Sequence, residues 1–266
     1  MDGFELYELG RKLMELGEDP EKSESAGDSS GRPPTATSVD ERLAAAAGIQ
    51  QPDQIKDLVE TLERLAGRLA GTVAPDTFDW YTTDTPPWDT GRPQPAIREL
   101  AEAGAFRGRV LEIGCGTGEI TLMAAALGRP AVGIDPAQTA IETARGKARD
   151  RGLDARFQVG NAFELGKLGE QFDTVLDSGL FHVFSDPERV RYADNLATVM
   201  PPGARLFVLC YSDRHPAGPG PRRVTQDEIR ATFANGWQVD SIDAATLDNR
   251  MYADGIPAWL ATITRV

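Results

Sequence analysis

The sequence predicts an α/β protein built on a doubly wound, mostly parallel sheet of seven strands. Two observations carry this prediction. From Arg109 onward, short apolar segments alternate with amphipathic ones, which is the pattern of strand–helix–strand units with right-handed crossovers. In addition, the first apolar segment runs into three glycines at alternate positions, in the stretch VLEIGCGTG at residues 110–118. Such a stretch is typical of a buried strand that ends in a tight turn before a helix.

The expected strands and helices alternate from Arg109 to the end of the chain. The strands comprise residues 109–113, 131–134, 155–159, 172–176, 205–211, 237–242 and 259–264. The helices comprise residues 119–127, 136–151, 187–199 and 225–234, and the second of them has a proline in its first turn. Thr225 and Glu228 stand three residues apart at the start of the last helix, which is the spacing of a capping box.

The first 75 residues lie outside this alternation. Residues 1–17 predict an amphipathic helix, which either packs on its own domain or docks a partner or a second copy of the chain. Residues 18–37 are rich in Glu, Ser, Gly and Pro and predict a flexible linker. Residues 38–75 predict a helical extension. Residues 76–266 then form the main domain, which opens with an aromatic, proline-rich lid at residues 76–95 that is able to lie over a ligand.

Composition argues against several kinds of partner. The chain has 28 basic and 41 acidic residues and a net charge of −13, so it offers no basic face for the phosphates of a nucleic acid. Its two cysteines fit reduced thiols in the cytoplasm better than a disulfide framework. We find no signal-peptide pattern and no apolar run long enough to span a bilayer, so we expect a cytoplasmic protein without a membrane partner.

The glycine-rich turn predicts a cofactor site. Gly114, Gly116 and Gly118 would let a ligand lie directly against the main chain, and the helix that follows would point its first amides into the same crevice. Their G-x-G-x-G spacing differs from the G-x-G-x-x-G of dinucleotide binders, which opposes the alternative of an NAD(P) oxidoreductase. With Glu112 two places before the first glycine, the motif resembles the signature of class I S-adenosylmethionine (SAM)-dependent methyltransferases, and this implies a Rossmann-like fold.

Residues after the first four strands extend the expected cofactor site. Asp135 ends the second strand, where a carboxylate is able to accept both ribose hydroxyls. The resemblance to class I methyltransferases implies that residues after the third strand address the adenine, although that family generally has Asp at the position of Asn161. The remaining expected cofactor contacts are Cys115, Pro136, Ala162 and Asp177.

The segment after the fourth strand is where methyl acceptors meet the sulfonium in class I methyltransferases. Here it is apolar and aromatic, and it lacks the N-P-P-Y motif of amino-group methyltransferases, so the expected acceptor is a small molecule. The near-neutral pKa of a histidine side chain suits His182 to take a proton from the acceptor. Methyl transfer often needs only proximity and in-line geometry, however. His182 is therefore either a general base or a wall of the acceptor pocket.

A more specific resemblance precedes the glycine turn. The segment PWDTGRPQPA at residues 87–96 resembles the W-D-x-G-x-P-Q-P-A lead-in of the thiopurine/thiol/halide methyltransferase group. The segments SGLFHVF at residues 178–184 and LCYSD at residues 209–213 resemble actinobacterial methyltransferases of heterocyclic toxins. The resemblance covers residues 79–266. It implies a lid in which Trp88 packs against SAM, with Trp80 as a further cofactor contact.

Together these features predict transfer of a methyl group from SAM to an N, O or S nucleophile of a small aromatic or heterocyclic molecule, with S-adenosylhomocysteine (SAH) as the second product. No metal is expected. The alternatives are a thiol or halide S-methyltransferase, and a SAM-binding protein without catalysis that regulates a partner. The residues expected beside the acceptor are Tyr81, Phe181, His182, Tyr211 and Arg214.

Overall fold

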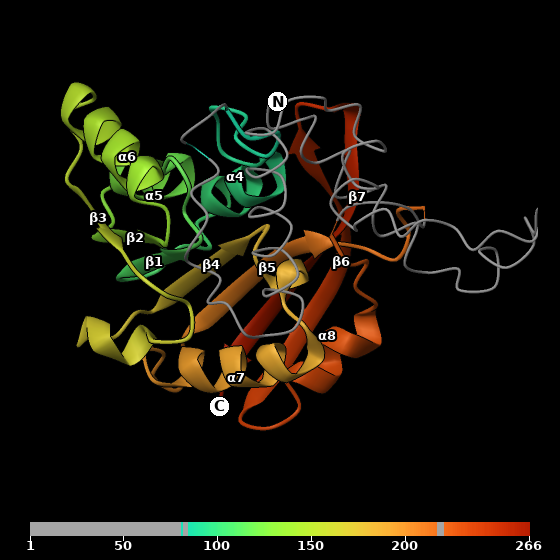
Figure 1. Ribbon diagram of the computed structural model, residues 1–266. Helices are drawn as coiled ribbons and strands as arrows, with labels where there is room; N and C mark the ends of the chain where they lie inside the picture. The colour runs from blue at the N-terminus through green and yellow to red at the C-terminus, as the bar shows by residue number, and fades with distance from the viewer. Residues whose placement is uncertain (1–80, 82–84, 217–220) are drawn as a thin grey trace, which may run out of the picture. The chain divides into compact units, whose positions relative to one another are not determined.

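A seven-stranded sheet runs through the computed structural model, which describes residues 81, 85–216 and 221–266 (Figure 1). The strand order is β3-β2-β1-β4-β5-β7-β6. Strands β1 to β5 are parallel, whereas β7 runs antiparallel to both β5 and β6. This confirms the doubly wound, mostly parallel sheet. The strands are β1 (Val110–Ile113), β2 (Ala131–Asp135), β3 (Ala155–Val159), β4 (Thr174–Ser178), β5 (Arg205–Tyr211), β6 (Trp237–Asn249) and β7 (Tyr252–Arg265).

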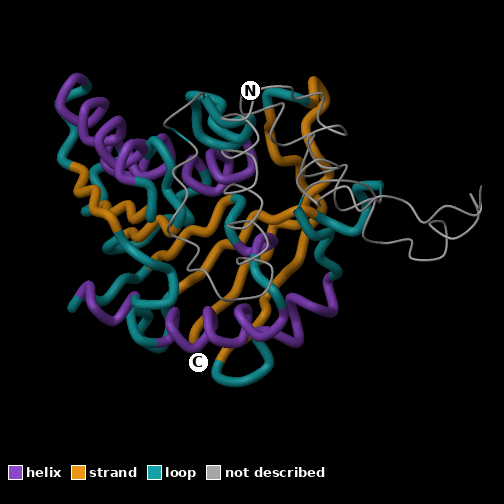
Figure 2. The backbone as a smooth tube through the Cα atoms, viewed as in Figure 1, coloured by secondary structure: helices purple, strands orange, loops and turns teal. Residues whose placement is uncertain are grey.

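Helices cover both faces of the sheet, and Figure 2 shows the strands between the two helical layers. One layer holds α4 (Pro95–Glu102), α5 (Glu119–Ala126) and α6 (Gln138–Asp150). The other holds α7 (Asp186–Ala197), α8 (Gln226–Thr232) and the short 3₁₀ helix η2 (Leu165–Leu168). A second 3₁₀ helix, η3 (Phe181–Val183), follows β4. Within the part of the chain described here, no helix has the length and apolar character needed to cross a membrane.

The helices and linker expected within residues 1–75 lie outside the described residues, as do positions 76–80 and 82–84 of the lid. The capping box at the start of α8 is confirmed. The Thr225 hydroxyl accepts a hydrogen bond from the Glu228 amide at 3.2 Å, and the Glu228 carboxylate accepts one from the Thr225 amide at 2.6 Å.

The central strands are buried on both faces, which explains why their sequences are nearly continuous apolar runs. Successive side chains point to opposite faces. Val110 therefore packs with residues of α4 and α5, whereas Leu111 and Ile113 join the larger core formed with α7 and α8. The same alternation turns Glu112 toward α5.

Two element boundaries differ from the expectation. The helix expected from Pro136 begins at Gln138, because the Asp135 side chain accepts a hydrogen bond from the Ala137 amide at 2.9 Å and closes a turn first. The strand expected at residues 172–176 lies two residues later, at Thr174–Ser178. Phe172 precedes it as a buried residue whose amide donates to the Val199 carbonyl at 2.9 Å.

The hairpin of β6 and β7 extends well beyond the two short strands expected at residues 237–242 and 259–264. Its outer half contains Gly255 and Pro257, residue types that disfavour strands. The structure accommodates Gly255 at a φ of +68° and interrupts the register between Leu247 and Asn249.

A distant segment supports this outer half. The Gln94 side chain donates to the Asp248 carbonyl at 3.0 Å and accepts from the Asp248 amide at 2.7 Å, as a paired strand residue would. The Arg250 amide donates to the Pro87 carbonyl at 2.8 Å, and the Arg92 guanidinium contacts the Asp248 carboxylate at 2.8 Å. The P-Q-P segment before α4 is therefore the partner that holds the long hairpin.

Candidate active site

Three glycines form a turn that requires glycine at each position. Gly114, Gly116 and Gly118 have φ angles of +70°, +49° and +86°, a region that other residues rarely adopt. Space is limited too. A methyl group on Gly118 would lie 2.6 Å from the Phe157 ring, and one on Gly116 would lie 2.6 Å from the Tyr81 hydroxyl. The turn thus presents bare main chain at the carboxyl edge of the sheet, where doubly wound folds bind ligands.

Glu112 caps α5 from inside the sheet. The N-cap position is Gly118, which has no side chain to accept a hydrogen bond from the first-turn amides. Glu112 accepts instead from the Thr121 amide at 2.7 Å and from the Thr121 hydroxyl. Burial raises the pKa of Glu112 to about 8, against the opposing effect of these two hydrogen bonds. The structure therefore places this expected cofactor contact behind the glycine turn.

Asp135 lies at the end of β2 beside the turn. One carboxylate oxygen accepts from the Gly116 amide at 2.8 Å, and the other accepts from the Ala137 amide at 2.9 Å. These two contacts hold the carboxylate at the carboxyl edge of the sheet. Cys115 is buried next to it, and burial raises the pKa of its thiol. Pro136 is exposed.

The turn after β3 reaches the same edge. The Gly160 amide donates to the Asp135 carbonyl at 3.1 Å, which brings Asn161 and Ala162 near the end of β2. The Asn161 side-chain oxygen accepts from the Phe163 amide at 2.8 Å and so stabilises this turn. Ala162 is half-buried and packs against the larger core.

Asp177 organises the segment after β4. It is completely buried, and its carboxylate accepts hydrogen bonds from the Leu180 amide at 3.0 Å, the Phe181 amide at 3.1 Å and the Tyr192 hydroxyl at 2.9 Å. Burial raises the pKa of Asp177 to about 6, although these hydrogen bonds oppose the rise. The Asp177 side chain, which was expected at the cofactor, holds η3 against α7 through these hydrogen bonds.

The described part of the lid converges on the glycine turn. Trp88, which is 44% exposed, donates its indole N–H to the Tyr81 hydroxyl at 3.2 Å. Tyr81 was expected beside the acceptor, but its hydroxyl lies over Gly116, and burial raises its pKa. Asp89 accepts from the Thr117 hydroxyl at 2.9 Å. Trp80 lies outside the described residues.

His182 belongs to η3 and is buried beside Tyr211, the last residue of β5. Its ring centroid is 4.3 Å from that of Tyr211, and its Nδ1 accepts from the Tyr211 amide at 3.2 Å. Burial, together with the positive charges of Arg189 and Arg223, lowers the pKa of His182 to about 3. The imidazole is therefore neutral at pH 7. Because Nδ1 is the accepting nitrogen, the ring proton sits on Nε2, and that nitrogen is a donor.

A row of four rings leads outward from this point. It comprises His182, Tyr211, His215 and Tyr252, with centroid distances of 4.3, 5.9 and 5.7 Å between successive members. Exposure rises from 5% at His182 to 40% at Tyr252. The ring row therefore runs from the carboxyl edge of the sheet to solvent and offers aromatic surface to a flat molecule.

Two other residues expected at the acceptor have ring contacts within the protein. Phe181 is completely buried, with its ring 5.9 Å from that of Phe233 and the Arg189 guanidinium 5.0 Å above it. It therefore supports η3 from within the core. Arg214 is exposed, and its guanidinium lies 5.0 Å from the Trp259 ring.

Comparisons with known proteins agree with this geometry. A family model described as a methyltransferase domain matches residues 110–203. The chain is 38% identical over 173 residues to 2-heptyl-1-hydroxyquinolin-4(1H)-one methyltransferase of Mycobacteroides abscessus, which covers 64% of this chain and 74% of that protein. The chain belongs to the class I SAM-dependent methyltransferases. SAM is accordingly its methyl donor.

Two further similarities fit this methyltransferase. It is 31% identical over 144 residues to probable thiol methyltransferase 2 of Arabidopsis thaliana, across 53% of this chain and 64% of that protein. It is also similar to a solved structure described as "Conversion of a Disulfide Bond into a Thioacetal Group during Echinomycin Biosynthesis". That similarity has a TM-score of 0.63 and 36% identity and covers 76% of this chain and 92% of the other.

The residues of this methyltransferase fit SAM. The φ angles of the three glycines keep the turn free of side chains, so a ligand is able to lie against its main chain. Asp135 supplies a fixed carboxylate at the adjacent strand end, and the first turn of α5 directs its amides toward the same edge. When bound, SAM supplies an electrophilic methyl group on its sulfonium.

Several residues around the methyltransferase site were not found from the sequence. Asp89 and Gln94 stood within the quoted lead-in motif, and their roles needed partners that only the fold brings close. Arg189 carried no signal, because it looks like one of several solvated charges on an amphipathic helix. In the structure its side chain is only 2% exposed, and its Nε and one Nη have no hydrogen-bond partner among the described residues.

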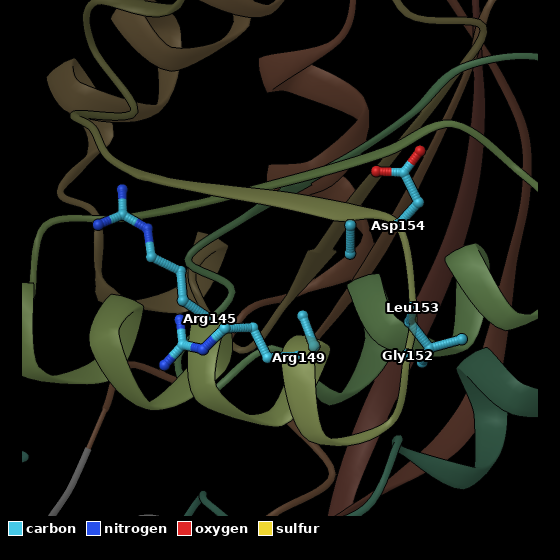
Figure 3. A pocket seen from close by; sticks show the side chains of 7 residues that line it. Arg145, Arg149, Gly152, Leu153 and Asp154 are labelled. Carbon is cyan, nitrogen blue, oxygen red and sulfur yellow. The ribbon is translucent and has the colours of Figure 1, made fainter.

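A separate hollow of about 440 Å³ lies at the opposite end of the sheet (Figure 3). It is formed where α6 ends and β3 begins, and Arg145, Arg149 and Asp154 are among its lining residues. Arg145 is already engaged, because it donates through two nitrogens to the Phe157 carbonyl. Since this hollow opens at the amino end of β3, it is not part of the methyltransferase site.

Proposed function

We propose that this methyltransferase transfers a methyl group to an N, O or S nucleophile of a small aromatic or heterocyclic molecule, in secondary metabolism. The observation that carries the proposal is the ring row, which begins in η3 with His182 and runs outward. The rings meet tilted or edge to face, and aromatic surface of this kind favours planar, apolar acceptors. The relative from Mycobacteroides abscessus is named for a hydroxyquinolinone, which belongs to the same chemical class.

We infer that His182 forms a wall of the acceptor pocket and is not the general base. Its accepting nitrogen is already used by the Tyr211 amide, and its pKa near 3 makes the neutral imidazole too weak a base to retain a proton at neutral pH. The Nε2–H is able instead to donate to an electron-rich atom of the acceptor. The nucleophile uses its lone pair on the methyl carbon while the carbon–sulfur bond breaks, and SAH leaves.

The charges around His182 favour an acceptor that is already ionised. Arg189 and Arg223 lower the pKa of His182 because their positive charges act at that position. The same field stabilises an oxyanion or a thiolate there. The chain as a whole is acidic, so the positive charge around His182 is a local feature. An ionised acceptor needs no general base, and the task of the protein is then to position it in line with the methyl group.

Thiol S-methylation is the second candidate function. The similarity to a probable thiol methyltransferase from Arabidopsis thaliana favours it, and a thiolate would benefit from the same local charges. We also propose, from the sequence alone, that the protein acts in the cytoplasm and that residues 1–17 dock a partner or a second copy.

The first test is a screen of methyl acceptors by mass spectrometry. The purified full-length protein, given SAM, is expected to methylate at least one hydroxyquinolinone, phenol or N-heterocycle and to release SAH. Turnover of aromatic thiols alone would favour the second candidate. Calorimetric binding of SAH with no product from any acceptor would support a SAM-binding protein without catalysis. Binding of NAD in place of SAH would contradict both catalytic proposals.

The second test concerns His182. Replacing His182 by Asn keeps an oxygen able to accept the Tyr211 amide, so kcat is expected to stay within about 3-fold of the unchanged enzyme. His182→Leu leaves that amide without an acceptor and is expected to lower kcat/KM by about 10-fold. Rates are measured with an acceptor that is ionised across the range. The profile of kcat is expected to be flat between about pH 5 and 8, because His182 stays neutral there.

An ionisation in that range that disappears in His182→Asn would identify His182 as a base and overturn the proposal that it is a wall. A flat profile in both proteins, with Leu weaker than Asn, would support it.

A further inference from the structure

A chain of hydrogen bonds joins the lid to the glycine turn and to α6. Asp89 accepts from the Thr117 hydroxyl at 2.9 Å, and the same hydroxyl oxygen accepts from the Lys147 ammonium at 2.7 Å. Lys147 also lies 3.0 Å from the Glu119 carboxylate. Because the ammonium occupies a lone pair of the hydroxyl, the single hydroxyl proton is directed to Asp89.

Both ends of this chain are fixed. In the lid, the second oxygen of Asp89 accepts from the Gly91 amide at 3.1 Å. At the C-terminal end of α6, Arg151 follows the last helical residue and donates through two nitrogens to Glu119, each at 2.8 Å. Thr117 between them is only 8% exposed. Hydrogen bonds that involve a charged partner are stronger than neutral ones, so these bonds fix the position of the lid on the turn.

The contact of Asp89 with Thr117 determines where the aromatic residues of the lid lie. Trp88 directly precedes Asp89, and its indole N–H is bonded to the Tyr81 hydroxyl. The Tyr81 hydroxyl lies over Gly116, and Thr117 is the next residue of the turn. Holding Asp89 on Thr117 therefore holds Tyr81 and Trp88 over the main chain that fits SAM.

We propose that Asp89 and Thr117 are positioning residues whose hydrogen bond latches the lid onto the glycine turn and sets the affinity for SAM and SAH. Lys147 orients the Thr117 hydroxyl for this bond. The proposal concerns the SAM site of the proposed function and does not depend on which acceptor is methylated. It is distinct from a contact that stabilises the fold alone, because such a contact would leave the affinity of the folded protein for SAH unchanged.

The test compares Thr117→Val with Thr117→Ser by calorimetric titration of the full chain with SAH. Valine has the shape of threonine but no hydroxyl, so Thr117→Val is expected to weaken SAH binding by about 10-fold. Serine keeps the hydroxyl and is expected to stay within about 3-fold. Asp89→Asn keeps one of the two oxygens that serve Thr117 and Gly91, so a smaller loss is expected. Asp89→Ala removes the bond and is expected to weaken SAH binding at least as much as Thr117→Val. The double variant of Asp89→Ala and Thr117→Val is expected to be no weaker than Asp89→Ala.

Rates and a matched control separate positioning from folding. The lower affinity for SAH is expected to arise from faster release of SAH, because a latch acts after binding. The release rate is measured by stopped-flow. Glu102→Gln is the control, since it makes the same acid-to-amide change as Asp89→Asn on the exposed end of α4, where Glu102 lies 3.7 Å from Arg98. Its SAH affinity is expected to equal that of the unchanged protein.

Lys147→Met is measured as well, in case Thr117→Val does not fold, because it removes the orienting ammonium and keeps the hydroxyl. It is expected to weaken SAH binding by about 3-fold. If the folded Asp89→Asn and Lys147→Met proteins both bind SAH as tightly as the unchanged protein, the proposal is overturned, even if they unfold at lower temperature. A failure of the proposed function would differ, because SAH would bind normally and no acceptor would be methylated.

Discussion

Replacing Gly118 by alanine is expected to lower the free energy of unfolding by about 3 kcal/mol. The added methyl group would lie 2.6 Å from the Phe157 ring and 2.9 Å from the Ala144 side chain. Both neighbours are almost completely buried, so they have little room to move. The φ of +86° adds the cost that any residue with a Cβ meets in the left-handed region.

Gly128→Ala is the matched control for this prediction. Gly128 has a similar φ of +72°, but a methyl group there would meet no atom within 4 Å. It therefore measures the backbone cost alone, about 1 kcal/mol. Both variants are unfolded in urea. If their free energies of unfolding fall with urea concentration at the same slope, the difference between the two free energies is due to packing. If Gly118→Ala were no less stable than Gly128→Ala, the contact between the glycine turn and β3 would not be tight.

The strands that could be predicted from sequence are those whose signal is local. β3 and β5 begin and end at the expected residues, because each is a run of strand-forming residues bounded by turns. The outer half of the β6–β7 hairpin has no such signal. Its partner is Gln94, 154 residues from Asp248, and a contact at that separation leaves no pattern in a window of sequence.

The candidate site divides in the same way. The topology alone places Gly116, Asp135 and Asn161 at one edge of the sheet, since the carboxyl ends of parallel strands meet there. Topology does not determine which way a side chain turns at that edge. Glu112 and Asp177 turn inward because Thr121 and Tyr192 offer them hydrogen bonds, and neither partner is identifiable before the helices are packed.

Replacing Asp135 by alanine is expected to weaken SAH binding by about 100-fold, measured by calorimetry. The carboxylate holds the Gly116 amide at 2.8 Å and the Ala137 amide at 2.9 Å, so its removal frees the glycine turn from the end of β2. We propose that it also removes an acceptor for the ribose hydroxyls of the ligand. Hydrogen bonds to a charged group each contribute about 1.5–3 kcal/mol, and the loss of one or two accounts for the expected effect.

Two further variants test whether the loss of SAH binding is specific to the carboxylate of Asp135. Asp135→Asn keeps one oxygen, which serves one amide but not both, so an intermediate loss of about 10-fold is expected. Asp154→Ala removes an exposed acid at the opposite end of the sheet and is expected to leave SAH binding unchanged. Equal affinities for Asp135→Ala and Asp154→Ala would contradict the prediction, because neither the hold on the turn nor the free oxygen lone pairs of Asp135 would then matter to SAH. A graded order from Asp through Asn to Ala would support it, since each lost oxygen removes one of the two bonds that hold the turn at the ligand edge.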